Sequence, residues 1–161
     1  MSNVGFVSLG CAKNQVDTEV MLGLLRKDGH ALVADPAQAD ILVVNTCGFI
    51  GPAKEESINA VLDMAQYKKY GRCKRLIVAG CMAQHYRADL EASLPEIDGF
   101  VTIDTLERIR EHCRLDGTPA EQSVPSSLYD HKFERVLTTP PWTAYLKAAE
   151  GYVEAMFSGA K

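Results

Sequence analysis

The sequence predicts an α/β protein with a five-stranded, mostly parallel, doubly wound sheet of the Rossmann or flavodoxin type and helices on both faces. Two observations lead to this fold class. Segments patterned as strands alternate with segments patterned as amphipathic helices, and most of the strand segments are continuous apolar runs. Such runs are typical of parallel strands that are covered on both faces. Five strands joined by right-handed crossovers most simply take the order 2-1-3-4-5.

The first strand and helix are predicted from the N-terminal segment. Residues 4–9 form an apolar run that stops at Gly10-Cys11, so we expect a buried strand that leads into a loop. In the helix that follows, Asn14 is expected to be the N-cap and Gly29 the C′ residue. The apolar residues of this helix, at helical spacing, are Val16, Val20, Met21, Leu24 and Leu25.

Two further strands precede the second helix. Residues 30–34 predict a short strand, and the apolar run at 41–46 predicts a stronger one that ends at Cys47-Gly48. Pro52 occupies the position of a first-turn proline. The helix after it is expected to bury one apolar face, formed by Ile58, Val61, Leu62 and Ala65.

The same alternation continues in the next segment of the chain. The apolar run at 76–79 predicts a strand that ends at Gly80-Cys81, and a helix is expected from there through Leu90. Residues 99–103 predict the last strand, and residues 105–114 predict the last helix.

Composition and charge limit the possible classes of protein. The chain has 161 residues, of which 47% are hydrophobic and 24% charged, as in an average globular domain. Its net charge of -4 argues against a strong electrostatic grip on nucleic acid. The sequence has no apolar run of the roughly 18 residues that a membrane span needs, and no signal peptide at its start. We therefore expect a cytoplasmic protein without a membrane partner.

Beyond residue 115 the composition changes. Four of the seven prolines fall there, with Ser and Thr around them, which is typical of a linker. We assign residues 116–138 to this linker and expect residues 139–161 to be too short for a second core. Trp142 and Tyr145 are candidates for a docking patch, or for packing back on the domain.

Cys11, Cys47 and Cys81 each directly follow a predicted strand. The carboxyl ends of parallel strands meet at one edge of a sheet, and these three strands are adjacent in the predicted order. Since neighbouring strands lie about 4.8 Å apart, we expect the three thiols within about 10 Å of one another. Thiolate ligands suit zinc or iron–sulfur. Structural zinc usually takes four ligands, often in close cysteine pairs, so three separate cysteines favour a 4Fe–4S cluster with one open iron.

The alternative is that these cysteines are packed core residues, because free cysteine is among the most buried residue types. We expect packing alone for Cys73, in a loop, and for Cys113, late in a helix. The histidines are scattered and are expected to be surface or packing residues; they are His30, His85, His112 and His131.

Three blocks of sequence resemble the motifs of the radical-SAM methylthiotransferases. The blocks are Ser8-Leu9-Gly10-Cys11-Ala12-Lys13-Asn14-Gln15-Val16-Asp17-Thr18-Glu19, then Asn45-Thr46-Cys47-Gly48-Phe49-Ile50 with Ala53-Lys54-Glu55-Glu56-Ser57-Ile58, and Val78-Ala79-Gly80-Cys81-Met82-Ala83-Gln84. The resemblance covers roughly residues 4–114. It implies that Cys11, Cys47 and Cys81 bind an auxiliary 4Fe–4S cluster in an N-terminal domain, residues 1–115.

The residues after the first two cysteines resemble the RimO branch of that family. This branch converts a C–H bond to C–S–CH3 on an aspartate of small ribosomal subunit protein twelve, using S-adenosylmethionine and a sulfur donor. The resemblance makes that protein the expected substrate and partner. Asn14, Asp17, Thr46 and Gln84 are candidates for supporting the cluster or for docking, with helix capping and solvated helix surface as the alternatives.

Residues 139–151 resemble the segment that leads into the radical-SAM core of the family. In the family a C-x-x-x-C-x-x-C motif for a second 4Fe–4S cluster follows, but here Tyr152, Met156 and Gly159 stand at its positions. We therefore expect no catalytic residue among these 161 residues and no catalysis by them alone. The radical-SAM domain is the partner that the resemblance implies.

Two other functions stay open at this point. One is the MiaB-like branch, whose substrate is a tRNA adenosine. The other is a flavodoxin-like module that binds a nucleotide or flavin, with Gly10 and Asn14 shaping a phosphate loop. The sequence has neither G-x-G-x-x-G nor G-x-x-x-x-G-K-[ST], which disfavours the second function.

Overall fold

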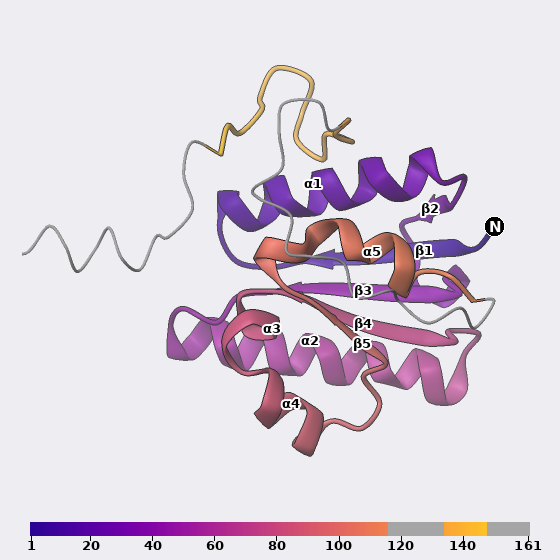
Figure 1. Ribbon diagram of the computed structural model, residues 1–161, viewed down its shortest axis with the longest axis vertical. Helices are drawn as coiled ribbons and strands as arrows, with labels where there is room; N and C mark the ends of the chain where they lie inside the picture. Colours follow the sequence, from indigo (N-terminus) through magenta and orange to yellow (C-terminus); the bar gives the residue numbers. More distant parts are fainter. Residues whose placement is uncertain (116–133, 148–161) are drawn as a thin grey trace, which may run out of the picture.

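The computed structural model describes residues 1–115 and 134–147. Within them, five strands form one sheet with the order β2-β1-β3-β4-β5, and every neighbouring pair is parallel (Figure 1). The fold class and the strand order predicted from the sequence are thus confirmed. The strands are β1 (Asn3–Ser8), β2 (Ala31–Val33), β3 (Ile41–Thr46), β4 (Arg75–Gly80) and β5 (Gly99–Val101).

Helices cover both faces of the sheet. Figure 1 shows α1 and α5 on one side and α2, α3 and α4 on the other. The α-helices are α1 (Ala12–Lys27), α2 (Gly51–Tyr70), α3 (Cys81–His85), α4 (Arg87–Ser93) and α5 (Ile109–His112), and two 3-10 helices are η1 (Pro36–Gln38) and η2 (Ile103–Arg108). None of the helices in the described residues is long and apolar enough to cross a membrane.

The sheet separates two apolar cores. Every residue of the central strand β3 is buried, which explains its unbroken apolar run, because its side chains point alternately into the two cores. One core joins Ile41 and Val43 to residues of α1, η2 and α5. The other joins Leu42 and Val44 to residues of α2, α3 and α4. The sheet is therefore packed against helices on both of its faces.

Two predictions about α1 have different outcomes. The helix begins at Ala12 with Cys11 as its N-cap, so the prediction of Asn14 as N-cap is wrong. The Asn14 side chain bonds to neighbouring loops instead of to its own helix. Gly29 follows the C-cap with φ +83°, a conformation that glycine adopts without strain, and its prediction is confirmed.

The later helices also differ from the prediction. The helix expected through Leu90 is interrupted at Tyr86, whose ring lies beside Gly48 and pairs with Lys54. The helix expected at 105–114 is 3-10 up to Arg108, with non-helical dihedrals at Thr105, and α-helical only from Ile109 to His112. The side chain of Thr105 accepts from the Thr102 N–H, and such a local bond competes with regular helix.

The apolar face of α2 is narrower than predicted. Val61 and Ala65 are buried, and they share a face with buried Ser57 because residues four apart lie above one another. Ile58 and Leu62 are exposed, since each stands one position, or about 100°, around the helix from that face.

Candidate metal centre

The three cysteines lie in the loops that follow adjacent strands β1, β3 and β4. Cys11 is the N-cap of α1, Cys47 comes directly after β3, and Cys81 is the first residue of α3. We call this part of the molecule the cysteine edge. Cys11 is exposed, Cys81 is half-buried and Cys47 is buried, so the thiols line the edge from the surface inwards.

Gly10 brings the first cysteine loop against the second. Its φ is +88°, and a Cβ atom at this position would lie 2.7 Å from Cys47 Cβ and 3.1 Å from Cys47 Sγ. Only a residue without a side chain allows this approach. The backbone just before Cys11 therefore rests on the Cys47 side chain.

The third thiol shares the environment of the other two. Burial raises the pKa of the Cys81 thiol, and the neighbouring Cys47 and Cys11 thiols act in the same direction. The Asp17 carboxylate also raises this pKa, whereas the Gly48 N–H lowers it. The charge state of Cys81 therefore depends on both other thiols as well as on its burial.

Asn14 connects all three cysteine loops. Its side chain is 2% exposed. The Nδ2 atom donates to the carbonyl oxygens of Leu9, at 3.1 Å, and Thr46, at 2.8 Å. The Oδ1 atom accepts from Cys81 Sγ at 3.7 Å. One amide from α1 thus binds the ends of β1 and β3 and the start of α3.

Polar side chains at the end of β3 extend this network. Asn45 Nδ2 donates to the Asn14 carbonyl at 2.7 Å and to Thr18 Oγ1 at 2.9 Å, and Thr46 Oγ1 donates to the Ala79 carbonyl at 2.6 Å. Asn45 and Thr46 are fully buried. Uncharged hydrogen bonds therefore fix the strand ends relative to one another.

Ser57 holds the main chain of Cys47. Its hydroxyl, fully buried in α2, accepts from the Cys47 N–H and donates to the Cys47 carbonyl, each at 3.0 Å. A single side chain thus satisfies both polar groups of this residue and sets the direction of its side chain.

Replacing Ser57 with alanine is expected to lower the free energy of unfolding by about 2 kcal/mol, because two buried main-chain groups lose their partner. Urea unfolding of the variant measures the loss. Ser93, which is exposed at the end of α4, supplies the matched control Ser93→Ala, for which no loss is expected. A Ser57 variant as stable as this control would contradict the assignment.

The remaining candidates are placed differently. Asp17 is 1% exposed and pairs with Lys147 at 2.6 Å. Gln84 is exposed, and its side chain accepts from the Ile103 N–H at 3.2 Å. The structure thus brings Asn14 and Thr46 to the cysteine loops, whereas Gln84 joins α3 to the start of η2.

Cys73 and Cys113 are packing residues, as predicted. They are 5% and 0% exposed, and burial raises the pKa of both thiols, that of Cys113 to about 12. Of the four histidines, His85 is exposed, His30 and His112 are half-buried, and His131 lies outside the described residues.

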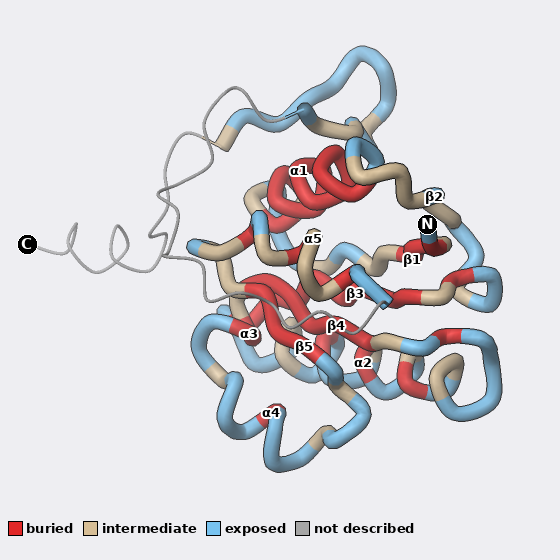
Figure 2. The backbone as a smooth tube through the Cα atoms, turned by 45° about the vertical axis from the view of Figure 1, so that its right-hand side comes forward, coloured by how far each residue is buried: buried red, intermediate tan, exposed pale blue. Residues whose placement is uncertain are grey.

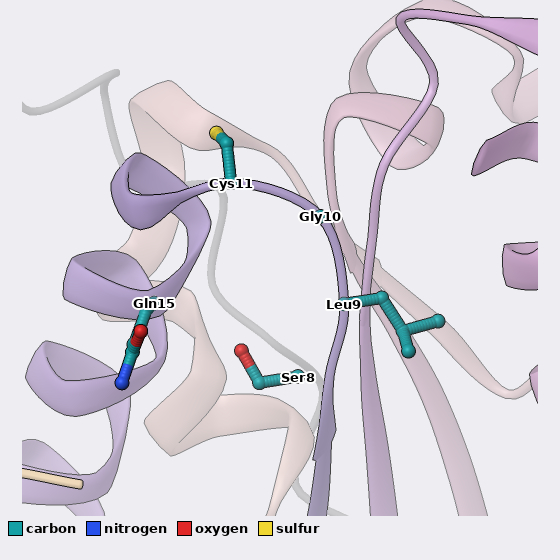
Figure 3. Close-up of a pocket in the computed structure, with 5 residues that line it drawn as sticks. All are labelled: Ser8, Leu9, Gly10, Cys11 and Gln15. Carbon is teal, nitrogen blue, oxygen red and sulfur yellow. The ribbon is translucent and has the colours of Figure 1, made fainter. Parts of the chain in front are cut away.

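A shallow hollow of about 220 Å³ opens at the first cysteine loop. Figure 3 shows the residues that line it, which are Ser8, Leu9, Gly10, Cys11 and Gln15. The Cys11 side chain projects from the loop away from Ser8 and Gln15 (Figure 3). This thiol is therefore accessible from solvent.

The donor set suits a cluster better than a single ion. In the described part of the chain, no three Cys, His, Asp or Glu side chains are grouped tightly enough to hold one metal ion. In an iron–sulfur cluster, thiolates bind different irons and stand farther apart. Cysteine thiolates are also the donors that such clusters take. The residues at the cysteine edge therefore fit an iron–sulfur cluster by the chemistry of their donor atoms.

Asn45 and Ser57 are the functional residues that the sequence reasoning missed. Asn45 interrupts an otherwise apolar strand directly before Thr46-Cys47, and this interruption is a usable signal because a buried polar group needs partners. Ser57 gave no such signal, since a serine in a polar helix segment is ordinary.

Comparison with known proteins supports a single family. The family model described as "Uncharacterized protein family UPF0004" matches residues 3–102. A protein named "Ribosomal protein uS12 methylthiotransferase RimO" from Symbiobacterium thermophilum is 54% identical over 151 residues, which cover 92% of this chain and 31% of the relative. Its namesake from Solibacter usitatus is 50% identical over 148 residues, which cover 92% of this chain and 32% of the relative.

The chain spans about a third of the length of the curated relatives it matches. The similarity covers the sheet and the three cysteine loops, since the family match extends from β1 to the residue after β5. Because this match takes in more than half of the chain, the chain belongs to the family described as Uncharacterized protein family UPF0004.

Proposed function

We propose that residues 1–115 form the auxiliary 4Fe–4S cluster domain of a methylthiotransferase, with Cys11, Cys47 and Cys81 as the cluster ligands. The observation that carries this proposal is the arrangement of three thiols on the loops of adjacent parallel strands, joined by the Asn14 side chain. When bound, the cluster supplies an open iron that holds sulfur for transfer. The full-length enzyme would use a second 4Fe–4S cluster and S-adenosylmethionine.

The residues of this chain would bind and orient the cluster. Ser57 fixes the backbone of the buried ligand Cys47, and Gly10 allows the loop of Cys11 to approach it. Cys11, the exposed ligand, leaves one side of the site open to a substrate. Asn14 and Thr46 keep the loops at fixed separation, which is the supporting role proposed for them.

The proposed substrate is an aspartate of ribosomal protein uS12. The supporting observation is that relatives at 46–54% identity are named for this reaction. In the proposed enzyme residues 116–138 connect the cluster domain to a radical-SAM region that begins near residue 139, so the 161 residues alone would bind the cluster without catalysis. We place the enzyme in the cytoplasm, where ribosomes are modified. The tRNA of the MiaB-like branch is the alternative substrate.

Anaerobic reconstitution with iron and sulfide tests the cluster. We expect about four irons per chain and the absorption and EPR spectra of a 4Fe–4S cluster. Among the three cysteine variants, Cys11→Ala gives the clearest test, because Cys11 is exposed and its replacement leaves the core intact. It should lose bound iron, as should Cys47→Ala and Cys81→Ala.

Cys73→Ala is the matched control, since it removes a buried thiol that precedes β4 and so lies at the amino end of this strand, whereas Cys81 follows its carboxyl end. It should keep the iron content of the parent chain. Full iron in Cys11→Ala, or equal loss in Cys73→Ala, would contradict the ligand assignment. A yellow protein with a flavin spectrum would favour the flavodoxin-like alternative.

Mass spectrometry of cells that lack the gene tests the substrate separately. We expect uS12 to lose its methylthio group and tRNA to keep its own. If tRNA lost its methylthio group and uS12 kept its own, the chain would be assigned to the MiaB-like alternative. This outcome does not depend on the iron measurement.

A further inference from the structure

Residues 134–147, here called the strap, lie against the outer side of α1, away from the sheet (Figures 1 and 2). Gln15 and Glu19 belong to one ridge of this helix, because residues four apart share a face. The Val136 N–H donates to the Glu19 main-chain oxygen at 3.0 Å, and Gln15 Nε2 donates to Thr138 Oγ1 at 3.0 Å. The strap thus follows the ridge towards the N-terminal end of α1.

The carboxylate of Glu19 is the main anchor of the strap. It is 1% exposed, although glutamate is rarely buried without partners. Oε1 accepts from the Thr138 N–H at 2.8 Å and from Thr138 Oγ1 at 3.0 Å, and Oε2 accepts from Arg135 Nη2 at 2.5 Å. All of these donors come from the strap, so Glu19 is satisfied only when the strap is in place.

Gly23 admits the strap to the helix surface. A Cβ atom on Gly23 would lie 1.9 Å from the Glu134 carbonyl oxygen. Glycine inside a helix is unfavourable relative to alanine, and this close backbone approach explains its presence here. On this ridge, Gly23 leaves room for the backbone of the strap, and the Glu19 carboxylate binds the strap.

The last described residue of the strap reaches the cysteine edge. Lys147 Nζ lies 2.6 Å from Asp17 Oδ1, and both side chains are buried, at 4% and 2% exposure. Asp17 lies one turn along α1 from Asn14, whose Oδ1 accepts from Cys81 Sγ at 3.7 Å. Gln15, which donates to Thr138 of the strap, lines the hollow at Cys11. The strap therefore ends at a carboxylate that borders the candidate cluster site.

We infer that the strap fixes the place where the chain leaves this domain, holding Lys147 beside the cysteine edge, with Asp17 and Glu19 as its positioning residues. The strap has a defined shape of its own, since Arg135 donates to the Tyr145 carbonyl at 3.1 Å. In the proposed methylthiotransferase, on which this purpose rests, the radical-SAM region begins near residue 139, within the strap, and continues beyond residue 147. A fixed strap presents that region to the edge that carries the three cysteines.

Energy transfer between the strap and the cysteine edge tests this inference. Trp142 is the only tryptophan of the chain, lies in the strap and is 84% exposed. An acceptor dye is attached to the exposed Cys11 in a Cys81→Ser background, where the other three cysteines are buried. We expect efficient transfer from Trp142 in the parent chain, far above its value in urea.

Two sets of variants should release the strap. In Asp17→Asn/Glu19→Gln the anchors are lost, and in Gly23→Ala the added methyl group meets the Glu134 backbone. We expect most of the transfer to be lost in both, with the far-UV circular dichroism of the domain unchanged. Trypsin cleavage after Lys147 should become about tenfold faster or more in the double variant, because charge-assisted bonds are lost.

The control is Glu91→Gln, which removes an exposed carboxylate that pairs with Arg87, and its transfer should equal that of the parent. Unchanged transfer in both test variants would overturn the inference. A higher unfolding temperature of Gly23→Ala with unchanged transfer would also overturn the inference. It would show that alanine stabilises the helix and that the added methyl group meets no strap backbone. Since the dye occupies Cys11 and no iron is added, these outcomes are independent of the cluster assignment.

Discussion

Replacing Gly80 with alanine is expected to lower the free energy of unfolding by about 4 kcal/mol. Gly80 has φ +87° and ψ −153°, a region open essentially to glycine alone. An added Cβ would also lie 2.3 Å from Asn45 Oδ1 and 2.6 Å from the Thr46 carbonyl oxygen. Both neighbours belong to the buried network, so relief of the clash breaks hydrogen bonds at the end of β3.

Urea unfolding measures this loss, and Gly51→Ala is its control. Gly51 begins α2, is exposed, and has nothing within 4 Å of an added Cβ. Its replacement should leave stability unchanged or slightly higher, since alanine favours helix. The account of Gly80 would be wrong if the two variants were equally stable. The Gly80 variant should also bind less iron on reconstitution, because Cys81 follows directly.

Replacing Asn14 with alanine is expected to cost about 3 kcal/mol of folding free energy. The change removes both donors to the Leu9 and Thr46 carbonyls and the acceptor of the Cys81 thiol. The Thr46 bond is fully buried, so no water replaces the lost partner. Alanine's higher helix propensity offsets only a few tenths of a kcal/mol of this loss.

Asn59→Ala provides the comparison, because Asn59 is an exposed asparagine inside α2. It should unfold at the same urea concentration as the parent chain or a higher one. If the Asn14 variant behaved in the same way, Asn14 would be a helix residue without a role in joining the loops.

The parallel sheet could be predicted because its signals are local. The buried run at 41–46 matches β3, and Pro52 lies in the first turn of α2 as expected. Continuous apolar strands separated by helices leave few topologies, since right-handed crossovers and a two-faced core exclude the rest. The same argument predicts Cys11, Cys47 and Cys81 at one edge of the sheet, where they follow β1, β3 and β4.

What the sequence did not reveal depends on contacts between distant residues. From the sequence, Asp17 is a candidate for supporting the cluster or for docking, with solvated helix surface as the alternative, and Glu19 has no assigned role. Both are buried, because residues 116 to 130 positions later cover them. From the sequence, Asn14 is a helix cap or a residue that supports the cluster, and only the positions of the loops after β3 and β4 show which groups it binds. Hydrophobic periodicity contains no information about such partners.

The separation in sequence of the bonds at the cysteine edge determines when this edge forms during folding. Asn14 is 32 residues from Thr46 and 67 from Cys81, and closing such loops costs entropy that increases with length. We therefore expect the Asn14–Cys81 bond to form after β1, β3 and β4 have paired, because the paired residues Val4 and Ile41, and Ile41 and Arg75, are closer in sequence. In a zinc finger the metal drives folding, whereas here two apolar cores supply the free energy. A metal centre would thus be inserted into a domain that is already folded, and its loss would leave the scaffold standing.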